Sequence, residues 1–205
     1  TPDGRQIIFS SNRGGIPGLW RIHSSGGNPE RLGVGDNAYY PSISRQGHRL
    51  AYTQLIGGSS IYRTEVRSST GRVGSPTKLV ASTRAANAPQ YSPDGKRITF
   101  ESDRSGSPEI WMCDSEGRNL VQLTSFGSGY AASPRWSPDG KQIAFGFRGT
   151  SEAEIYVVSA EGGGPRRVMT EGSDAGVPSW SQDGTYIYFT SQRGGDQQVW
   201  KVLAE

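Results

Sequence analysis

The sequence predicts an all-β fold built from repeated four-stranded units, a β-propeller, on three observations. Glycine accounts for 29 and proline for 12 of the 205 residues, a density of chain breakers that excludes a mainly helical protein. A Pro-Asp-Gly turn motif returns along the chain with a step of 43 to 48 residues. Around each copy, apolar and polar residues alternate with the period of two that is typical of half-buried strands.

The repeat is anchored by glycines and by residues at constant distances from them. The clearest copies of the motif are Tyr91–Lys96 and Trp136–Lys141, and Trp180–Gly184 is a close third. Pro2–Gly4 is a truncated copy and Ile43–Gly47 a degraded one. The aligned glycines are Gly4, Gly47, Gly95, Gly140 and Gly184. Each is followed by two spaced aromatic residues: Phe9 and Trp20, Tyr52 and Tyr62, Phe100 and Trp111, Phe145 and Tyr156, Phe189 and Trp200.

Within each copy the pattern predicts four strands, A to D. Strand A is expected to begin at a proline, because proline suits the start of a strand better than its centre. An Asp-Gly turn then leads to strand B, since glycine accepts the positive φ of a tight hairpin. A turn around Asn12-Arg13 or Asp103-Arg104 leads to strand C, and a glycine turn leads to strand D. The prolines are Pro41, Pro89, Pro134 and Pro178, and the D strands are expected at 30–32, 77–80, 121–123 and 166–169.

Short antiparallel strands with this period are typical of propeller blades, whereas a β-sandwich gives no reason for so constant a phase. The copies 1–33, 34–80, 81–124, 125–170 and 171–205 form one propeller region. Strands B and C occur five times but A and D four times, so about four and a half blades are present. We therefore expect an arc of a larger propeller, with six or more blades in the parent protein, whose open ends expose apolar faces and favour self-association.

The residues of the motif carry a family resemblance that covers nearly the whole chain. Trp-Ser-Pro-Asp-Gly-Lys-x-Ile-Ala-Phe at 136–145, Ser-Asp-Arg-x-Gly at 102–106 and the later Ile-Trp or Ile-Tyr resemble the WD-like repeat of TolB-like bacterial propellers. Similar repeats occur in the non-catalytic propellers of prolyl-oligopeptidase-like and tricorn-type peptidases, and in bacterial winged-helix regulators with C-terminal propellers. The resemblance implies a periplasmic or otherwise exported protein, with a cytoplasmic location left open.

Composition excludes several classes of function. The net charge is only +3, and basic residues are spread along the chain among 19 acidic ones, so no basic stripe indicates nucleic-acid binding. No apolar run approaches the roughly 18 residues of a membrane-spanning helix, so no membrane insertion is expected. Cys113 is the single cysteine, which excludes a disulfide within the chain and a multi-cysteine metal site.

No catalytic constellation is evident in the sequence. A serine hydrolase of the oligopeptidase kind needs Gly-x-Ser-x-Gly, which does not occur here. His23 and His48 do not recur between copies and are expected at the surface, and no metal site or cofactor is expected. Asp114–Gly117 superficially resembles a calcium loop but fits a C–D hairpin turn better. The repeated Asp3, Asp94, Asp139 and Asp183 are interpreted as turn residues.

Candidate binding residues are those that depart from the repeat. The D-to-A connections contain copy-specific Tyr39, Tyr40, Phe126, Tyr130 and Asp174, and such loops often form the binding face of repeat proteins. Arg13, Arg104, Arg148 and Arg193 lie in or near the B–C turns. They have two interpretations: each ties its hairpin to the neighbouring blade, or together they attract an acidic partner to one mouth of the propeller.

The sequence therefore supports a non-enzymatic protein-interaction or sensing propeller that binds a protein or peptide. The alternative is an accessory propeller of a prolyl-oligopeptidase-like or tricorn-like peptidase, with the catalytic domain elsewhere on the parent chain. A third hypothesis, an enzyme with its site in the propeller channel, lacks the residue clusters that catalysis needs.

Overall fold

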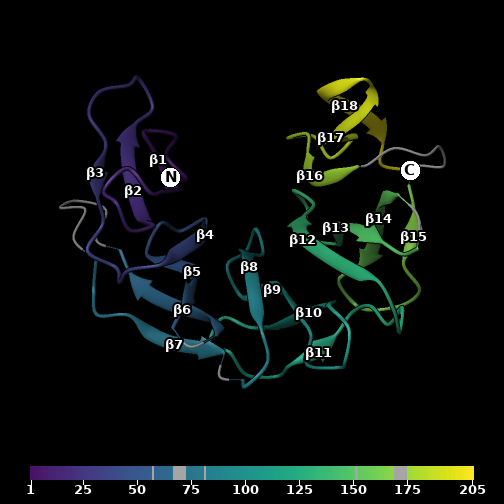
Figure 1. Ribbon diagram of the computed structural model, residues 1–205, viewed down its shortest axis with the longest axis horizontal. Coiled ribbons are helices and arrows are strands. Elements are labelled where there is room, and N and C mark those ends of the chain that lie inside the picture. The colour runs from purple at the N-terminus through teal and green to yellow at the C-terminus, as the bar shows by residue number, and fades with distance from the viewer. Residues whose placement is uncertain (57, 67–72, 81, 151, 169–174) are drawn as a thin grey trace.

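The computed structural model describes all residues except 57, 67–72, 81, 151 and 169–174 (Figure 1). The described chain contains 18 strands and no helix, and therefore no helix that could cross a membrane. The strands form five antiparallel sheets, which we call blades 1 to 5. The all-β propeller predicted from the repeat is confirmed.

Each blade is a meander in which consecutive strands pair. Blade 1 contains β1 (Gln6–Ser11), β2 (Gly18–His23) and β3 (Glu30–Arg31). Blade 2 contains β4 (Ala38–Ile43), β5 (Arg49–Leu55), β6 (Ser59–Glu65) and β7 (Thr77–Val80). Blade 3 contains β8 (Ala86–Tyr91), β9 (Arg97–Ser102), β10 (Glu109–Asp114) and β11 (Val121–Gln122). Blade 4 contains β12 (Tyr130–Trp136), β13 (Gln142–Arg148), β14 (Ala153–Ser159) and β15 (Arg166–Arg167), and blade 5 contains β16 (Gly176–Trp180), β17 (Tyr186–Gly194) and β18 (Asp196–Leu203).

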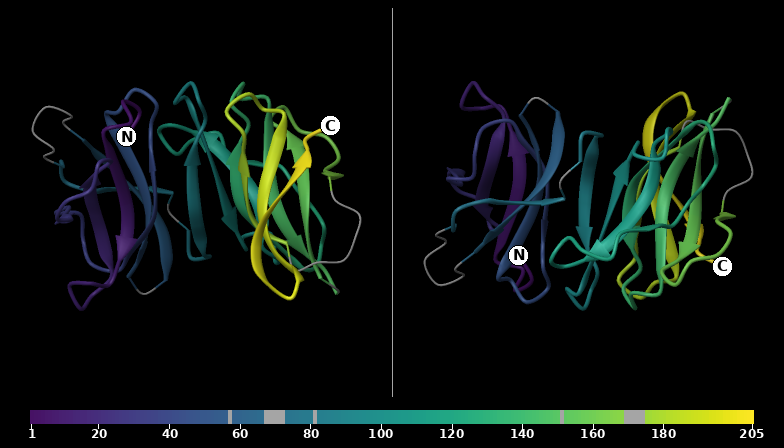
Figure 2. Two further views of the ribbon diagram at one scale, coloured as in Figure 1. Left: turned by 90° about the horizontal axis from the view of Figure 1, so that it is seen from above. Right: turned by 90° about the horizontal axis from the view of Figure 1, so that it is seen from below.

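The blades stand side by side in an open arc, with blades 1 and 5 at its two ends (Figure 1). The A strands β4, β8, β12 and β16 contact one another along the inner side, and the short D strands lie on the outside (Figure 1). Because the strands alternate in direction, the B–C turns and D-to-A connections lie on one rim, which we call the connection rim. The A–B and C–D turns lie on the other, the turn rim, and the strands run between the two (Figure 2).

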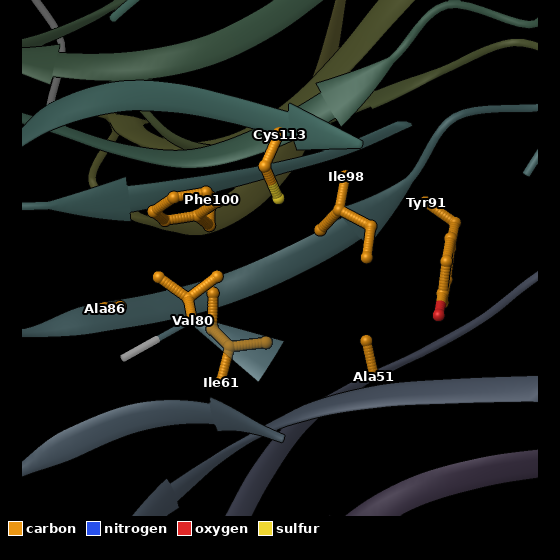
Figure 3. Close-up of a cluster of buried hydrophobic side chains, with 8 residues drawn as sticks. All are labelled: Ala51, Ile61, Val80, Ala86, Tyr91, Ile98, Phe100 and Cys113. Carbon is orange, nitrogen blue, oxygen red and sulfur yellow. The ribbon is translucent and has the colours of Figure 1, made fainter. Parts of the chain in front are cut away.

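The core consists of separate layers between consecutive blades. Between blades 2 and 3, Ala51 and Ile61 face Ile98 and Phe100, and all four side chains are fully buried (Figure 3). The first aromatic of the repeat is fully or almost fully buried in blades 2 to 5 as Tyr52, Phe100, Phe145 and Phe189. A blade thus buries its apolar faces only by packing against its neighbours, which is why the aromatic positions recur with the repeat.

The end blades expose positions that are buried elsewhere. Ile7 of blade 1 is 53% exposed, whereas its counterparts Leu50, Ile98, Ile143 and Ile187 are fully buried. At the other end of the arc, Val199 is 72% exposed, while the equivalent Ile155 is fully buried. These are the apolar end faces expected of a partial propeller; the number of blades in the parent protein stays a prediction.

The Asp-Gly turns have the structure predicted for them. The Ser92 hydroxyl donates to Asp94 Oδ1 over 2.6 Å, and the Lys96 amide donates to the same oxygen over 3.1 Å. Gly95 has a φ of +71°, which requires glycine. The hydroxyl and amide donors lower the pKa of Asp94 below its ordinary value. Asp3, Asp139 and Asp183 have the same contacts and the same direction of pKa shift, so these repeated carboxylates serve the turns.

Two details of the strands differ from the prediction. The repeat prolines lie inside the A strands, not at their starts, because each strand begins about three residues earlier and contains a bulge at the proline. A bulge interrupts the hydrogen-bonded ladder, so a residue without an amide proton is tolerated there. Three D strands are shorter than expected, ending at Arg31, Gln122 and Arg167. Of the predicted D-strand residues, Met169 lies outside the described part of the chain.

Candidate functional site

Every bulge of the A strands places a non-glycine residue in the left-handed region. Tyr40, Ala88, Ser133 and Val177 have φ between +46° and +55°, and each directly precedes a repeat proline. This conformation is uncommon for residues with a Cβ atom, and valine resists it most because of its branched side chain. Its recurrence in four inner strands indicates that the bulges shape the channel side of the propeller.

Two of the four bulge amides are accepted by side chains from the preceding blade. The Tyr40 amide donates to Ser10 Oγ over 3.1 Å, and the Ser133 amide donates to Glu101 Oε2 over 3.2 Å. Ser10 and Glu101 occupy the same register position in strand B of their blades, as does Gly146 in blade 4. Glycine has no side chain to accept the Val177 amide. This strand B position therefore offers the bulge a hydroxyl in Ser10, a carboxylate in Glu101 and no side-chain acceptor in Gly146.

Glu101 is a buried carboxylate at this position. Its side chain is only 8% exposed, and its Oε1 accepts the Tyr130 hydroxyl over 3.1 Å. Burial raises the pKa of Glu101, and the hydrogen bonds from Ser133 and Tyr130 offset part of that rise. Burial and the adjacent Glu101 raise the pKa of Tyr130 as well. Glu101 thus fixes the start of blade 4 by holding both a bulge amide and an exposed tyrosine.

A small hollow of about 200 Å³ lies where Gly146 leaves space between blades 4 and 5. Its walls are mainly apolar and include Tyr130, Ala132, Phe147 and Val177. Tyr130 and Val177 are also about half exposed, so the hollow opens on the side of the connection rim. An apolar or aromatic side chain of a partner would fit a hollow of this size and lining.

Exposed apolar side chains gather on the connection rim. Among the described residues, six large hydrophobic residues that are at least 44% exposed belong to the B–C turns, to the end of β5, or to the beginning and bulge of an A strand: Ile16, Tyr40, Leu55, Ile56, Tyr130 and Val177. The others lie on the outer edge of blade 3 or on the end blades: Leu120, Val121, Ile7, Tyr188, Val199 and Leu203. The connection rim is thus the rim with apolar contact area.

The aromatic residues predicted for binding have different surroundings. Tyr40 and Tyr130 are exposed by 54% and 46%, and Tyr39 is half-buried with its ring 6.3 Å from that of Tyr40. Phe126, expected with them on the binding face, is only partly exposed: it stacks on Phe147 with ring centroids 3.8 Å apart and packs against the core between blades 3 and 4. Asp174 lies outside the described residues.

Three of the four predicted arginines have a packing role in their own blade. The guanidinium of Arg104 lies 5.2 Å from the ring centroid of Phe100 and 5.1 Å from that of Trp111. Arg13 and Arg193 cover the equivalent aromatic pairs in the same way. These three arginines thus make cation–π contacts within their own blades. Arg148 lies one position out of this register, at the end of β13 beside the Gly146 hollow.

The remaining polar candidates have structural surroundings. Burial raises the pKa of the Cys113 thiol to about 12, so the sulfur packs as an apolar group. Asp114 accepts the amides of Glu116 and Arg118, which confirms a C–D turn. His23 and His48 are exposed. Within the described ranges, no group of three or more His, Cys, Asp or Glu side chains is placed to hold a metal ion.

Sequence reasoning missed the bulges, Glu101, Gly146 and Val177. The available signal was the register itself: Glu101 is a carboxylate where the other blades have Ser10, Thr53, Gly146 and Thr190. A charged residue at a position of small residues indicates a special contact. The left-handed residue before each proline had no signal, because that position is normally extended.

Comparisons with known proteins agree with this fold. Residues 123–205 match the TolB beta propeller domain. The chain is 33% identical over 154 residues to the Tol-Pal system protein TolB of Bordetella pertussis, a match that covers 75% of this chain and 34% of that protein. The structure superposes on TolB of Acinetobacter baumannii with a TM-score of 0.79 and 26% identity, covering 98% of this chain and 50% of that one.

A puromycin hydrolase also superposes, with a TM-score of 0.76 over 99% of this chain and 35% of that one, but at 16% identity it shares only the fold. The chain spans less than half the length of the curated relatives that it matches. The repeat motif, the bladed arc and these matches agree: the chain forms a β-propeller that is similar to the propellers of TolB proteins.

Proposed function

We propose that this chain is a non-enzymatic protein-interaction propeller that binds a protein or peptide on its connection rim. The observation that carries the proposal is the group of exposed apolar side chains on that rim, from Ile16 to Val177. Tyr40 and Tyr130 are suited to this role, because tyrosine supplies a large rigid contact area together with a hydroxyl group. The Gly146 hollow beside them offers a place for one anchoring side chain of the partner.

The relatives support the same kind of role. The matched Bordetella pertussis protein is a component of the Tol-Pal system. By that resemblance we propose that the parent protein is exported and that its propeller works by binding a partner. The peptidase alternative has no specific observation in its favour, since the similarity to puromycin hydrolase is a similarity of fold.

The binding proposal is tested by replacing Tyr39, Tyr40 and Tyr130 together by alanine and quantifying the proteins recovered from an extract of the native host. We expect the triple variant to lose a partner that the unchanged chain recovers. Tyr188→Ala is the matched control, because Tyr188 is a partly exposed tyrosine on the end face of blade 5. Circular dichroism would first establish that both variants are folded. Equal recovery by the triple variant and the control would refute binding at this rim.

The absence of catalysis is tested separately on peptide and ester substrates. We expect no turnover above background, because a nucleophile, a base and an orienting group are all required and the sequence offers no such set. Turnover that a single substitution abolishes would contradict the non-enzymatic part of the proposal while leaving the binding part intact.

A further inference from the structure

The turn-rim mouth of the channel forms a hollow of about 490 Å³. Each of the five blades contributes to its lining, mostly through the end of an A strand and the first residues of the A–B turn. It lies on the opposite rim from the exposed tyrosines. The hollow is therefore independent of the connection-rim site proposed above.

The charged side chains that line this hollow are all positive. Arg45 and Arg135 line it, and no aspartate or glutamate does. The carboxylates of the turn motifs line neighbouring hollows: Asp94 and Asp139 share one of about 300 Å³ with Arg45, and Asp139 and Asp183 share another of about 330 Å³ with Lys141 and Arg166. The hollow thus concentrates positive charge on a rim whose turn motifs are acidic, and such a site attracts anions.

Arg135 is held firmly in the wall. Its backbone carbonyl accepts the Trp180 indole N–H over 3.0 Å, and its own Nη1 donates to the Pro134 carbonyl over 2.8 Å. Burial lowers the pKa of Arg135, and the charge of Glu101 offsets only part of this effect. Glu101 is itself occupied by Tyr130 and Ser133. The guanidinium is therefore a fixed, partly desolvated cation with donors left for another acceptor.

Arg45 lies at the outer edge of the hollow. Its side chain is exposed, and within the described part of the chain its guanidinium forms no hydrogen bond or ion pair. The copies with the full motif have proline at this position, Pro93 and Pro138, so the arginine departs from the repeat. Its planar fork suits a carboxylate, which it binds through two parallel N–H···O bonds.

The walls between the two cations complete a binding surface. Trp136 and Trp180 belong to the lining, as do Gln90 and Gln182. Flat aromatic surfaces pack against the carbon skeleton of a ligand, while amide N–H groups donate to its oxygens. This combination favours an organic anion over a bare inorganic one.

We propose that the turn-rim hollow binds carboxylate groups, with Arg135 as the half-buried anchor and Arg45 as the outer one. A free polycarboxylate and the acidic side chains of a peptide present the same chemistry. Both enter from the side opposite the connection rim, so a ligand here leaves the tyrosine rim open to a partner.

The test is calorimetric titration of the 205-residue chain with citrate and, in a second arm, with a hexaglutamate peptide capped at both ends. The ionic strength is held constant, and a capped hexaglutamine peptide is the neutral control. We expect saturable binding of at least one anionic ligand and none of the neutral peptide. Fluorescence of Trp136 and Trp180 should change with the same saturation curve. The arm that binds more tightly identifies the source of the carboxylate.

Arg135→Gln and Arg45→Gln should each weaken binding about tenfold, the loss expected for a hydrogen bond to a charged group. Arg84→Gln is the matched control, since it removes the same charge from an exposed residue in the connection between blades 2 and 3. If Arg135→Gln fails to fold, exposed Arg45 still provides the test. No saturable binding of either anion, unchanged affinity in Arg45→Gln, or an equal loss in Arg84→Gln would overturn the proposal.

Discussion

Blades 3 and 4 differ in the side chains that cover their aromatic pair at the connection rim. Each carries the aromatic pair of the repeat, Phe100 with Trp111 and Phe145 with Tyr156. In blade 3 the connection-rim end of the pair is covered by the guanidinium of Arg104, whose Nε donates to Ser102 Oγ over 3.0 Å. In blade 4, Phe147 occupies the place of that serine, and Phe126 stacks on it and forms a T-shaped pair with Tyr156.

The second solution depends on a loop from the neighbouring blade. Phe126 follows strand D of blade 3, and its amide donates to the buried carboxylate of Glu109 over 2.7 Å. The Gly127 amide donates to the same oxygen over 3.2 Å, and Thr124 Oγ1 donates to the other. Glu109 thereby fixes the connection that delivers Phe126. The comparison shows that both blades have the aromatic pair but differ in what covers it. In blade 3 the covering residue, Arg104, belongs to the same blade, whereas in blade 4 the covering residue, Phe126, comes from the neighbouring blade.

The largest loss of stability is expected for the buried phenylalanine that the two blades have in common. Phe100→Ala and Phe145→Ala should each lower the free energy of unfolding by about 3–5 kcal/mol, because both side chains are fully buried between blades. Urea unfolding followed by circular dichroism measures the loss. Arg118→Ala, in an exposed turn, is the control and should change stability by less than about 0.5 kcal/mol. Clearly unequal losses for the two phenylalanines would break the equivalence of the blades.

The next largest loss of stability is expected for Phe126, which covers the aromatic pair of blade 4. Phe126→Ala should destabilise by about 2–3 kcal/mol, since it removes a half-buried ring and its stacking on Phe147. Phe126→Leu is the matched control, because it keeps most of the apolar volume and should recover part of the loss. The same unfolding assay applies. A loss below that of Arg104→Ala would show that the aromatic cover adds nothing over the cationic one.

A smaller loss of stability is expected for Arg104, which covers the aromatic pair of blade 3. Arg104→Ala should cost about 1 kcal/mol, the range of a partly desolvated cation–π contact. Arg104→Lys should restore only part of this, because an ammonium group lacks the planar stacking surface. The comparison is made at low and at high salt. Full recovery by lysine would reduce the role of Arg104 to charge alone.

The smallest effect is expected in the Asp-Gly turns, which are alike in the two blades although the residues that cover the aromatic pairs differ. Asp94 and Asp139 have the same turn contacts in blades 3 and 4, and hydrogen bonds from Ser92 and Ser137 lower the pKa of both. Because the pKa is lower in the folded state than in the unfolded chain, this stabilisation is present above the ordinary aspartate pKa of 3.8 and is lost as the pH falls below it.

Asp94→Asn and Asp139→Asn should therefore each reduce the loss of stability between pH 6 and pH 3 by a similar small amount. The difference between urea midpoints at the two pH values is the measurement. If one variant changed the pH dependence and the other did not, the turns would not be equivalent, and the contrast between the blades would extend to the turn rim.

Much of the fold was predictable because the repeat is local. Strand order, the Asp-Gly turns and the buried aromatic pairs follow from short-range patterns such as Tyr91–Lys96 and from alternation in the flanking strands. The candidate site was predictable only in outline. Tyr40 and Tyr130 were found as departures from the repeat, but Phe126 was placed on the surface, since its partner Phe147 lies in the next blade.

The sequence by itself determined the propeller architecture, its blade order and the rim on which the variable loops lie, because each depends on residues within one repeat. Only the tertiary structure decided the rest: the bulges before the prolines, the burial of Glu101, the Gly146 hollow and the cationic mouth formed with Arg45 and Arg135. These features arise where different blades meet. Their residues are some 30 to 90 positions apart in the sequence, where no local pattern connects them.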